Sequence, residues 1–195
     1  KTGTLTQNQM TVYQTNFYGL EEQKTGDNEI TRLIFEGIAA NTTAFLDLSE
    51  PGKIKTLGNP TEAALLLWLN RQHTDYSVLR ENVRIIDQLT FSTERKYMAT
   101  LVESSLIGKR VLYVKGAPEI VYSHCKNVQT AGGLKSTADF QTTVNTQLSE
   151  YQKQAMRTLG FAYQIIDDND SHFHEGRLFH TELTFLGIVA ISDPI

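Results

Sequence analysis

Residues 83–116 (VRIIDQLTFSTERKYMATLVESSLIGKRVLYVKG) mark a change in the hydrophobic pattern of the chain. Three segments of this stretch, 83–91, 97–103 and 110–114, are rich in β-branched and aromatic residues, which favour strands. A short loop containing Gly108 joins the second segment to the third, so we expect these two to form a hairpin. The stretch therefore predicts a sheet whose neighbouring strands are connected locally.

Helical patterns lie on both sides of these predicted strands. We expect helices over 29–41, 60–71 and 76–82, a short one from Pro118, and a long one over 138–158. Further strands are expected over 10–18, 161–166 and 183–191, and loops over 21–28, 46–56 and 167–180. Asn59 and Pro60 suit the start of the second helix, and Gly160 suits the end of the last. The result is an α+β fold with helices packed on a sheet, whose strand order the pattern does not assign.

The composition is that of a globular protein with one core. Of the 195 residues, 40% are hydrophobic and 21% are charged, which argues against disorder. The net charge of −4 gives no general basic surface, so we expect no binding to nucleic acid or to an anionic membrane. The longest apolar run, 63–69, is far shorter than the ~20 residues of a membrane-spanning helix. The single cysteine, Cys125, allows no intrachain disulfide, which fits a reducing compartment.

Three short stretches contain residues that suit an anionic or aromatic ligand. In KTGTLT (1–6), the backbone of a glycine turn can face an anion, and the Thr hydroxyls add donors or metal ligands. In FSTERKYM (91–98), an aromatic residue and two cations follow a strand, and stacking of such a ring on a base contributes roughly 1–3 kcal/mol. In VKGAPE (114–119), a lysine precedes a glycine turn at a strand end. Taken singly, each stretch also fits a solvated turn. For the stretch 91–98, this alternative places Phe91 in the core and the charged residues in a solvated turn.

A fourth stretch, NPTEAALL (59–66), allows two roles for one carboxylate. Glu62 stands three residues after Asn59, as in a capping box, where its side chain would accept a hydrogen bond from the Asn59 backbone. Glu62 could instead accept a hydrogen bond from an exocyclic amine of a ligand. The side chain cannot do both fully, and local physics favours the cap.

Together and in this order, the four stretches resemble the cytoplasmic catalytic insert of the P-type ATPases. The family pattern around its phosphorylated residue is Asp-Lys-Thr-Gly-Thr-Leu-Thr, of which this sequence has all but the Asp. The segment SDPI (192–195) is similar to the family's Asp-Pro-Pro-Arg hinge, with Ile195 where Pro often stands. The chain therefore looks like a fragment that begins one residue after the nucleophile.

The resemblance covers essentially the whole chain and implies its domain organisation. Residues 1–9 would be a remnant of the phosphorylation-domain motif and hinge, and 191–195 the return hinge to that domain. Residues 10–190 would form a nucleotide-binding domain, a mainly antiparallel sheet flanked by helices.

The resemblance also implies a nucleotide site. This site is expected to consist of Glu62, Phe91, Arg95, Lys96, Lys115, Gly116 and Arg157. Phe91 matches the aromatic residue that stacks on adenine, and Lys96 and Lys115 match two lysines of the pocket. Glu62 matches the acidic residue near the adenine amino group, and Arg157 matches an arginine that reaches toward the phosphates.

Two positions depart from or extend this site. Thr93 stands where some calcium pumps have an arginine beside the nucleotide, so we expect that phosphate contact to be either missing or replaced by Arg95. Thr4 is expected to help place a metal ion and the phosphoryl group. No catalytic residue is expected within the chain, because the phosphorylated Asp would immediately precede Lys1.

The implied function is to bind ATP with Mg²⁺ and to deliver the γ-phosphate to an aspartate of the adjacent phosphorylation domain, which powers ion transport. The parent would be an integral membrane protein with actuator and transmembrane domains, and this chain a cytoplasmic part of it. The isolated chain is expected to bind nucleotide weakly without hydrolysing it. Its motifs look most like the calcium-pump branch, while proton, sodium/potassium and magnesium pumps stay open.

Other functions are compatible with the bare sequence. A stand-alone nucleotide-sensing module without transport activity is one alternative. A haloacid-dehalogenase-type phosphatase is another, but it needs its own nucleophile, and around Asp193 nothing completes such a site. The loop 167–180 carries Asp and His residues, yet their spacing fits no calcium loop, so we expect it to be solvated.

Overall fold

An eight-stranded sheet forms the centre of the structure, a computed structural model that describes residues 9–167, 169 and 171–193. Its strands are β1 (Thr11–Phe17), β4 (Val83–Leu89), β5 (Tyr97–Ser104), β6 (Lys109–Gly116), β7 (Cys125–Thr130), β8 (Gly133–Ser136), β9 (Arg157–Ile166) and β12 (Leu183–Ser192). Their order is β4–β5–β6–β9–β12–β7–β8, and β1 pairs with β12 on the same edge as β7. All neighbours are antiparallel except β7 and β12, so the predicted α+β fold with a mainly antiparallel sheet is confirmed.

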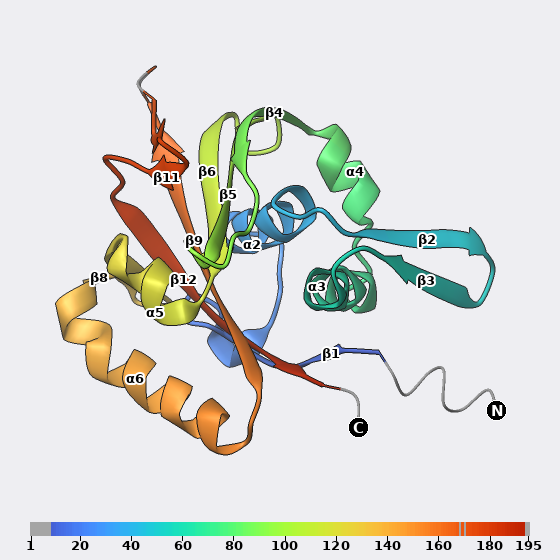
Figure 1. Cartoon of the computed structure of the whole chain (residues 1–195), viewed down its shortest axis with the longest axis horizontal. Helices are drawn as coiled ribbons and strands as arrows, with labels where there is room; N and C mark the ends of the chain where they lie inside the picture. Colours follow the sequence, from blue (N-terminus) through green and yellow to red (C-terminus); the bar gives the residue numbers. More distant parts are fainter. Residues whose placement is uncertain (1–8, 168, 170, 194–195) are drawn as a thin grey trace.

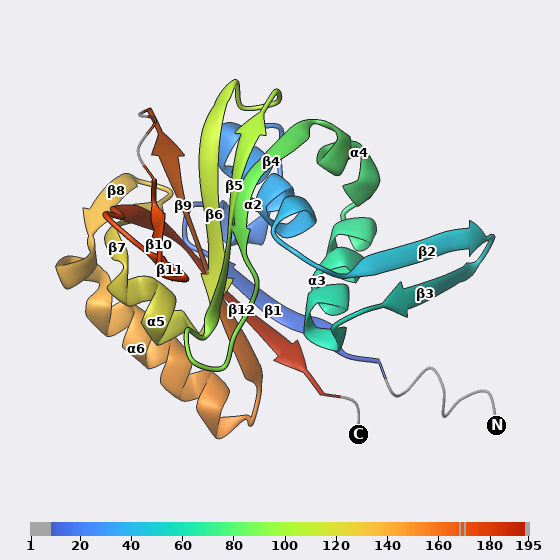
Figure 2. The same cartoon turned by 45° about the horizontal axis from the view of Figure 1, so that its top comes forward.

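Helices cover both faces of this sheet (Figures 1 and 2). The helices are α2 (Glu29–Ala40), α3 (Pro60–Arg71), α4 (Tyr76–Glu81), α5 (Pro118–Ser123) and α6 (Thr137–Lys153), with a 3₁₀ turn at Glu21–Gln23. On one face, Leu66 and Trp68 of α3 are buried together with residues of α2 and α4. On the other face, Tyr122 of α5 and Tyr151 of α6 are buried against the sheet. The first three predicted helices and the short one from Pro118 are confirmed to within a residue or two.

Strand β12 contributes to both cores, and a bulge changes which of its residues face each side. Phe185, Ile188 and Ala190 all lie in the core under α5 and α6. In a regular strand, odd- and even-numbered residues face opposite sides, so Phe185 would not share a face with Ile188 and Ala190. The three share a face here because the register with β9 shifts between Phe185 and Gly187. A Cβ on Gly187 would lie 2.1 Å from the carbonyl oxygen of Asn16, so only glycine allows β1 to approach here.

The long predicted helix over 138–158 is wrong at its C-terminal end. Helix α6 ends at Lys153, and Ala155 adopts a φ of 55°, which breaks the helical path. Arg157 then begins β9, so Gly160 lies inside a strand and does not terminate a helix. A Cβ on Gly160 would lie 2.8 Å from Cα of Pro118, so the glycine permits close packing of the strand against the start of α5.

Two predicted loops contain hairpins. Within 46–56, β2 (Phe45–Glu50) pairs with β3 (Lys53–Leu57), because Pro51 and Gly52 form a tight turn in which Gly52 has a φ of 77°. This hairpin projects from the body of the structure (Figure 2). Within 167–180, β10 (Phe173–His174) pairs with β11 (Arg177–Leu178). The sequence reading also missed β7 and β8, a third hairpin.

The ends of the predicted domain organisation are only partly described. Residues 1–8, which include Thr4 and the KTGTLT stretch, lie outside the described residues, as do 194–195 of the predicted return hinge. The boundaries at 10 and 190 therefore stay predictions. In the part of the chain that the structure describes, no helix is both long and apolar enough to cross a membrane.

Candidate functional site

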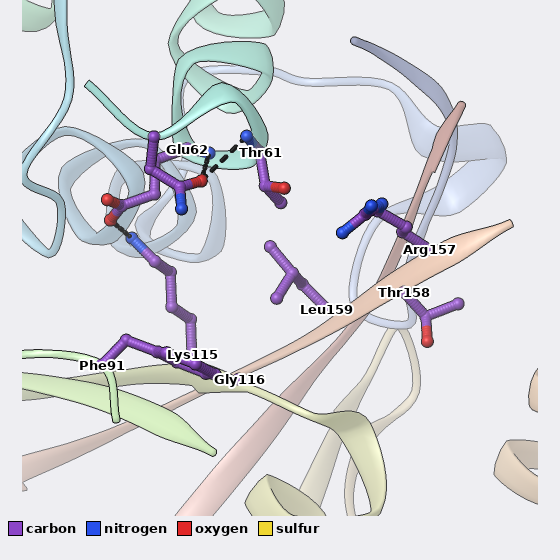
Figure 3. Close-up of a pocket in the computed structure, with 9 residues that line it drawn as sticks. Thr61, Glu62, Phe91, Lys115, Gly116, Arg157, Thr158 and Leu159 are labelled. Atoms are coloured by element: carbon purple, nitrogen blue, oxygen red, sulfur yellow. Dashed lines mark hydrogen bonds and ion pairs between the residues drawn. The ribbon is translucent and has the colours of Figure 1, made fainter. Parts of the chain in front are cut away.

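A cavity of about 390 Å³ opens where four separate parts of the chain meet. These parts are the start of α3, the loop after β4, the end of β6 and the start of β9. The lining residues are Asn59, Thr61, Glu62, Phe91, Lys115, Gly116, Arg157, Thr158 and Leu159 (Figure 3). Five of the seven nucleotide-site residues predicted from the resemblance are among them, although they are spread over almost a hundred residues of sequence.

Strand pairing places the glycine and lysine of this cavity. Lys115 and Gly116 end β6, opposite Met98 and Tyr97 of β5. The Ala117 backbone N–H then donates to the carbonyl oxygen of Lys96 at 2.9 Å. A Cβ on Gly116 would lie 2.2 Å from that same oxygen, so only glycine lets the two strand ends approach this closely.

Lys115 and Glu62 form a buried ion pair on one side of the cavity (Figure 3). The Lys115 ammonium donates to Oε2 of Glu62 at 2.6 Å, and Lys115 is only 5% exposed. Burial lowers the pKa of Lys115, against the opposing effect of the Glu62 charge. Burial alone would raise the pKa of Glu62, but the Lys115 charge and the hydrogen bonds from Lys115 and Thr43 outweigh it and lower that pKa. The carboxylate is therefore held ionised beside the lysine.

The segment after α2 completes the surroundings of this pair. Thr43 donates from its hydroxyl to Oε1 of Glu62 at 2.7 Å, and Lys115 also donates to the carbonyl oxygen of Asn41. The buried Asn41 side chain in turn donates to the Met98 carbonyl at 3.2 Å and accepts from the Thr100 hydroxyl at 2.7 Å. Asn41 and Thr43 thus position the ion pair, and the sequence reading missed both because no motif marks them.

Helix α3 begins with a cap that does not use Glu62. Oδ1 of Asn59 accepts from the backbone N–H groups of Thr61 and Glu62 at 2.9 and 3.1 Å. The predicted N-cap is therefore confirmed. The alternative in which Glu62 accepts from the Asn59 backbone, as in a capping box, is wrong. The Glu62 side chain points to Lys115 and accepts hydrogen bonds from Lys115 and Thr43 instead (Figure 3).

Phe91 lies on the loop after β4 and is 57% exposed. The alternative that placed Phe91 in the core is therefore wrong. An exposed aromatic ring at the rim of a cavity is free to stack on a planar ligand.

Arg157 lies across the cavity from the Lys115–Glu62 pair (Figure 3). It is the first residue of β9, and its Nε atom lies 3.0 Å from Oδ1 of Asp193. Both side chains are about half exposed, so solvent screens this pair. Thr158 and Leu159 follow Arg157 along the cavity wall. The predicted site did not include them, because the resemblance matched no site residue of the family to these two positions.

The remaining predicted site residues are not among those that line the cavity. The guanidinium of Arg95 donates to the backbone oxygens of Thr90 and Gly176. Lys96 is exposed, with a φ of 64°. Thr4 lies outside the described residues. Among the residues that are described, no group of three or more His, Cys, Asp and Glu side chains is arranged to hold a metal ion.

Comparison with known proteins identifies relatives over the full chain. Residues 29–195 match the family model described as "P-type ATPase, cytoplasmic domain N". The chain is 30% identical to calcium-transporting ATPase PAT1 of Dictyostelium discoideum and 30% identical to plasma membrane calcium-transporting ATPase 4 of Homo sapiens. It is 29% identical to calcium-transporting ATPase 1 of Lactococcus lactis. Each match covers 100% of this chain but only 18%, 17% and 22% of the respective relative, so the chain spans about a fifth of their length.

Proposed function

This chain belongs to the P-type ATPase family as a cytoplasmic domain N, and from that premise we propose that it binds ATP in the cavity. The observation that carries the proposal is the convergence of Glu62, Phe91, Lys115, Gly116 and Arg157 on one cavity. Its volume of about 390 Å³ lies within the range of ~300–1,000 Å³ that small-molecule sites occupy. Arg95 and Lys96 stay predicted contacts, without support from the lining of the cavity.

Each residue in the cavity has a chemical role in this proposal. Phe91 stacks on adenine, which contributes roughly 1–3 kcal/mol. Gly116 lets the ends of β5 and β6 approach each other beside the ligand. Lys115 closes the pocket with Glu62, whose carboxylate faces the adenine amino group. Arg157 pairs with the phosphates through charge-assisted hydrogen bonds.

Mg²⁺ is expected to enter together with the ATP phosphates. When bound, it offsets the negative charge on the phosphoryl oxygens. The described residues offer no clustered ligand set for it, and the predicted ligand Thr4 lies outside them. In this proposal the metal ion is held by the phosphates and by groups outside the described residues.

In the parent protein, the bound nucleotide is presented to an aspartate of a phosphorylation domain. The aspartyl phosphate splits ATP hydrolysis into two steps and drives cation transport. The names of the relatives favour calcium as the cation. The remaining partners are the phosphorylation, actuator and transmembrane domains of the same protein, with this domain on the cytoplasmic side. Since phosphoryl transfer in this proposal needs that aspartate, we expect a chain without it to bind ATP and not to hydrolyse it.

An ATP titration followed by amide NMR tests this proposal. Wild type should bind ATP saturably, with shifts near Phe91 and Lys115. Phe91→Ala should weaken binding by roughly tenfold or more, the equivalent of a lost stacking contact. Arg84→Met is the matched control, because Arg84 pairs with Glu103 away from the cavity lining. A folded wild-type chain that shows no saturable binding at millimolar ATP would contradict the proposal.

A further inference from the structure

A small hairpin outside the cavity is attached to the loop that carries Phe91. Arg95 donates from Nη1 to the Gly176 carbonyl oxygen at 3.0 Å, across 81 residues of sequence. Beside it, Nη2 of Arg177 lies 2.9 Å from Oε1 of Glu94. These contacts join the loop between β4 and β5 to the turn of the β10–β11 hairpin, which contributes no residue to the cavity lining.

The base of the hairpin is fixed by a buried hydrogen bond. The backbone N–H of Leu178 donates to the hydroxyl oxygen of Tyr97 at 2.9 Å. Tyr97 is only 2% exposed and is the first residue of β5. The hairpin is therefore anchored to β5, the strand into which the loop leads, so that it can support the loop.

Arg95 transmits this support to Phe91. Its guanidinium bridges two backbone oxygens, that of Gly176 in the hairpin and that of Thr90 in the loop. Thr90 immediately precedes Phe91, so the bridge fixes the peptide from which the ring extends. A planar guanidinium with several donors in a fixed fork suits two acceptors at once, which a lysine ammonium on a flexible stem does less well.

We propose that Arg95 is a positioning residue, which holds the Thr90–Phe91 backbone against the β10–β11 hairpin so that the Phe91 ring faces the nucleotide base. The inference rests on the proposed function, since it needs a base in the cavity. It differs from the sequence-based expectation that Arg95 contacts a phosphate. The hairpin consequently controls affinity for the base without touching the ligand.

The two roles of Arg95 predict opposite ligand dependence. A positioning role acts through Phe91, so it affects ligands that contain a base. A phosphate contact acts on the charge of the ligand, so it affects ligands that contain phosphates. Adenosine and inorganic tripolyphosphate separate these two cases, because each carries one half of ATP.

The test compares Arg95→Met with wild type for ATP, adenosine and tripolyphosphate by NMR titration. We expect the Kd of ATP and of adenosine to rise by roughly three- to tenfold, a part of the stacking contribution, while that of tripolyphosphate stays unchanged. In a Phe91→Ala background, Arg95→Met should cause no further loss of affinity for ATP or adenosine. The reason is that the effects of two coupled residues on binding do not add. Arg95→Lys should restore little of the lost affinity for ATP and adenosine, although lysine keeps the positive charge.

Two further measurements guard against general unfolding. Arg84→Met, the control variant, should leave all three affinities unchanged. In the ligand-free protein, Arg95→Met should shift and broaden the amide signals of Thr90, Phe91 and Gly176 while the rest of the spectrum is retained. If Arg95→Met does not fold, Arg177→Met provides the same comparison with a smaller expected effect, because it weakens only the exposed pair with Glu94.

The possible outcomes separate this inference from the proposed function. If wild type binds ATP and adenosine but Arg95→Met and Arg177→Met bind adenosine equally well, the positioning role is wrong and the proposed function stands. If Arg95→Met weakens tripolyphosphate and adds to Phe91→Ala, Arg95 is a phosphate contact. If wild type binds neither ATP nor adenosine, the proposed function fails, and the inference fails with it.

Discussion

The two ion pairs at the cavity combine the same kinds of groups in opposite surroundings. In Lys115–Glu62, the two side chains are 6% and 12% exposed, and neighbouring backbone and hydroxyl groups complete their hydrogen bonds. In Arg157–Asp193, they are 58% and 47% exposed. A buried pair is costly to break because an unpaired charge stays behind in the protein, whereas an exposed pair is replaced by water at little cost. The first pair therefore stabilises the shape of the cavity, and the second leaves Arg157 available to a ligand.

The largest expected effect comes from breaking the buried pair on one side only. Glu62→Leu leaves the Lys115 ammonium buried without its carboxylate and should lower the free energy of unfolding by about 3–5 kcal/mol. Adding Lys115→Met should recover most of this loss, since apolar residues of similar volume often replace a buried pair without net cost. Urea unfolding of the single and double variants measures both values. A loss below about 1 kcal/mol for the single variant would show that the pair is not buried in solution.

The pH dependence of stability provides a second test of the contribution of the buried Lys115–Glu62 pair. Because the pKa of Glu62 is lower in the folded chain than its ordinary value of 4.5, its contribution is present above that pH and is lost as the pH falls below it. Each unit by which the pKa differs between the folded and the unfolded chain corresponds to about 1.4 kcal/mol of folding free energy. Unfolding of wild type and Glu62→Gln between pH 6 and pH 3 should therefore converge at the acid end. Parallel curves would contradict this linkage.

A smaller effect is expected from the neighbours that hold the buried pair. Thr43→Val removes the hydroxyl that donates to Glu62, and this should cost about 1 kcal/mol of stability. Thr43→Ser keeps the hydroxyl and serves as the matched control. Thermal unfolding of the two variants measures the difference. Equal melting temperatures for Val and Ser would show that Thr43 does not support the pair.

The smallest effect on stability is expected at the exposed pair. Asp193→Asn should change the free energy of unfolding by at most about 0.5 kcal/mol. The ATP affinity should stay the same or rise slightly, because Arg157 loses a competitor for the phosphates. Arg157→Met should leave stability similarly unaffected but raise the Kd of ATP. A loss of stability as large as that of Glu62→Leu would remove the contrast between the two pairs.

Local signals explain why the helices and half of the described strands could be predicted from the sequence. The Asn59-Pro60 start of α3 and the β-branched runs of β4 to β6 act through neighbouring residues, so the local sequence is enough to predict them. Gly160 was misread because a glycine that ends a helix and a glycine that permits close packing look alike in sequence. Only the fold shows that Pro118 lies against it.

The site was predicted only in part, for a related reason. The resemblance to a family indicated Phe91, Lys115 and Arg157, and the cavity brings them together. It could not show that the Asn41 carbonyl accepts from Lys115, or that Arg95 reaches Gly176, because these contacts join residues far apart in sequence. Such contacts depend on tertiary structure and leave no local pattern.

The position of β12 also has a consequence for how the protein is made. This strand lies in the interior of the sheet, between β9 on one side and β7 with β1 on the other, yet it follows all of them in sequence. During synthesis, those three strands leave the ribosome before the partner that completes their hydrogen bonding, so their edges stay open. Pairing of β1 with β12, which lie at opposite ends of the described chain, is slow, and open edges favour aggregation. We therefore expect the sheet to be completed only once β12 has been translated, with a need for chaperones until then.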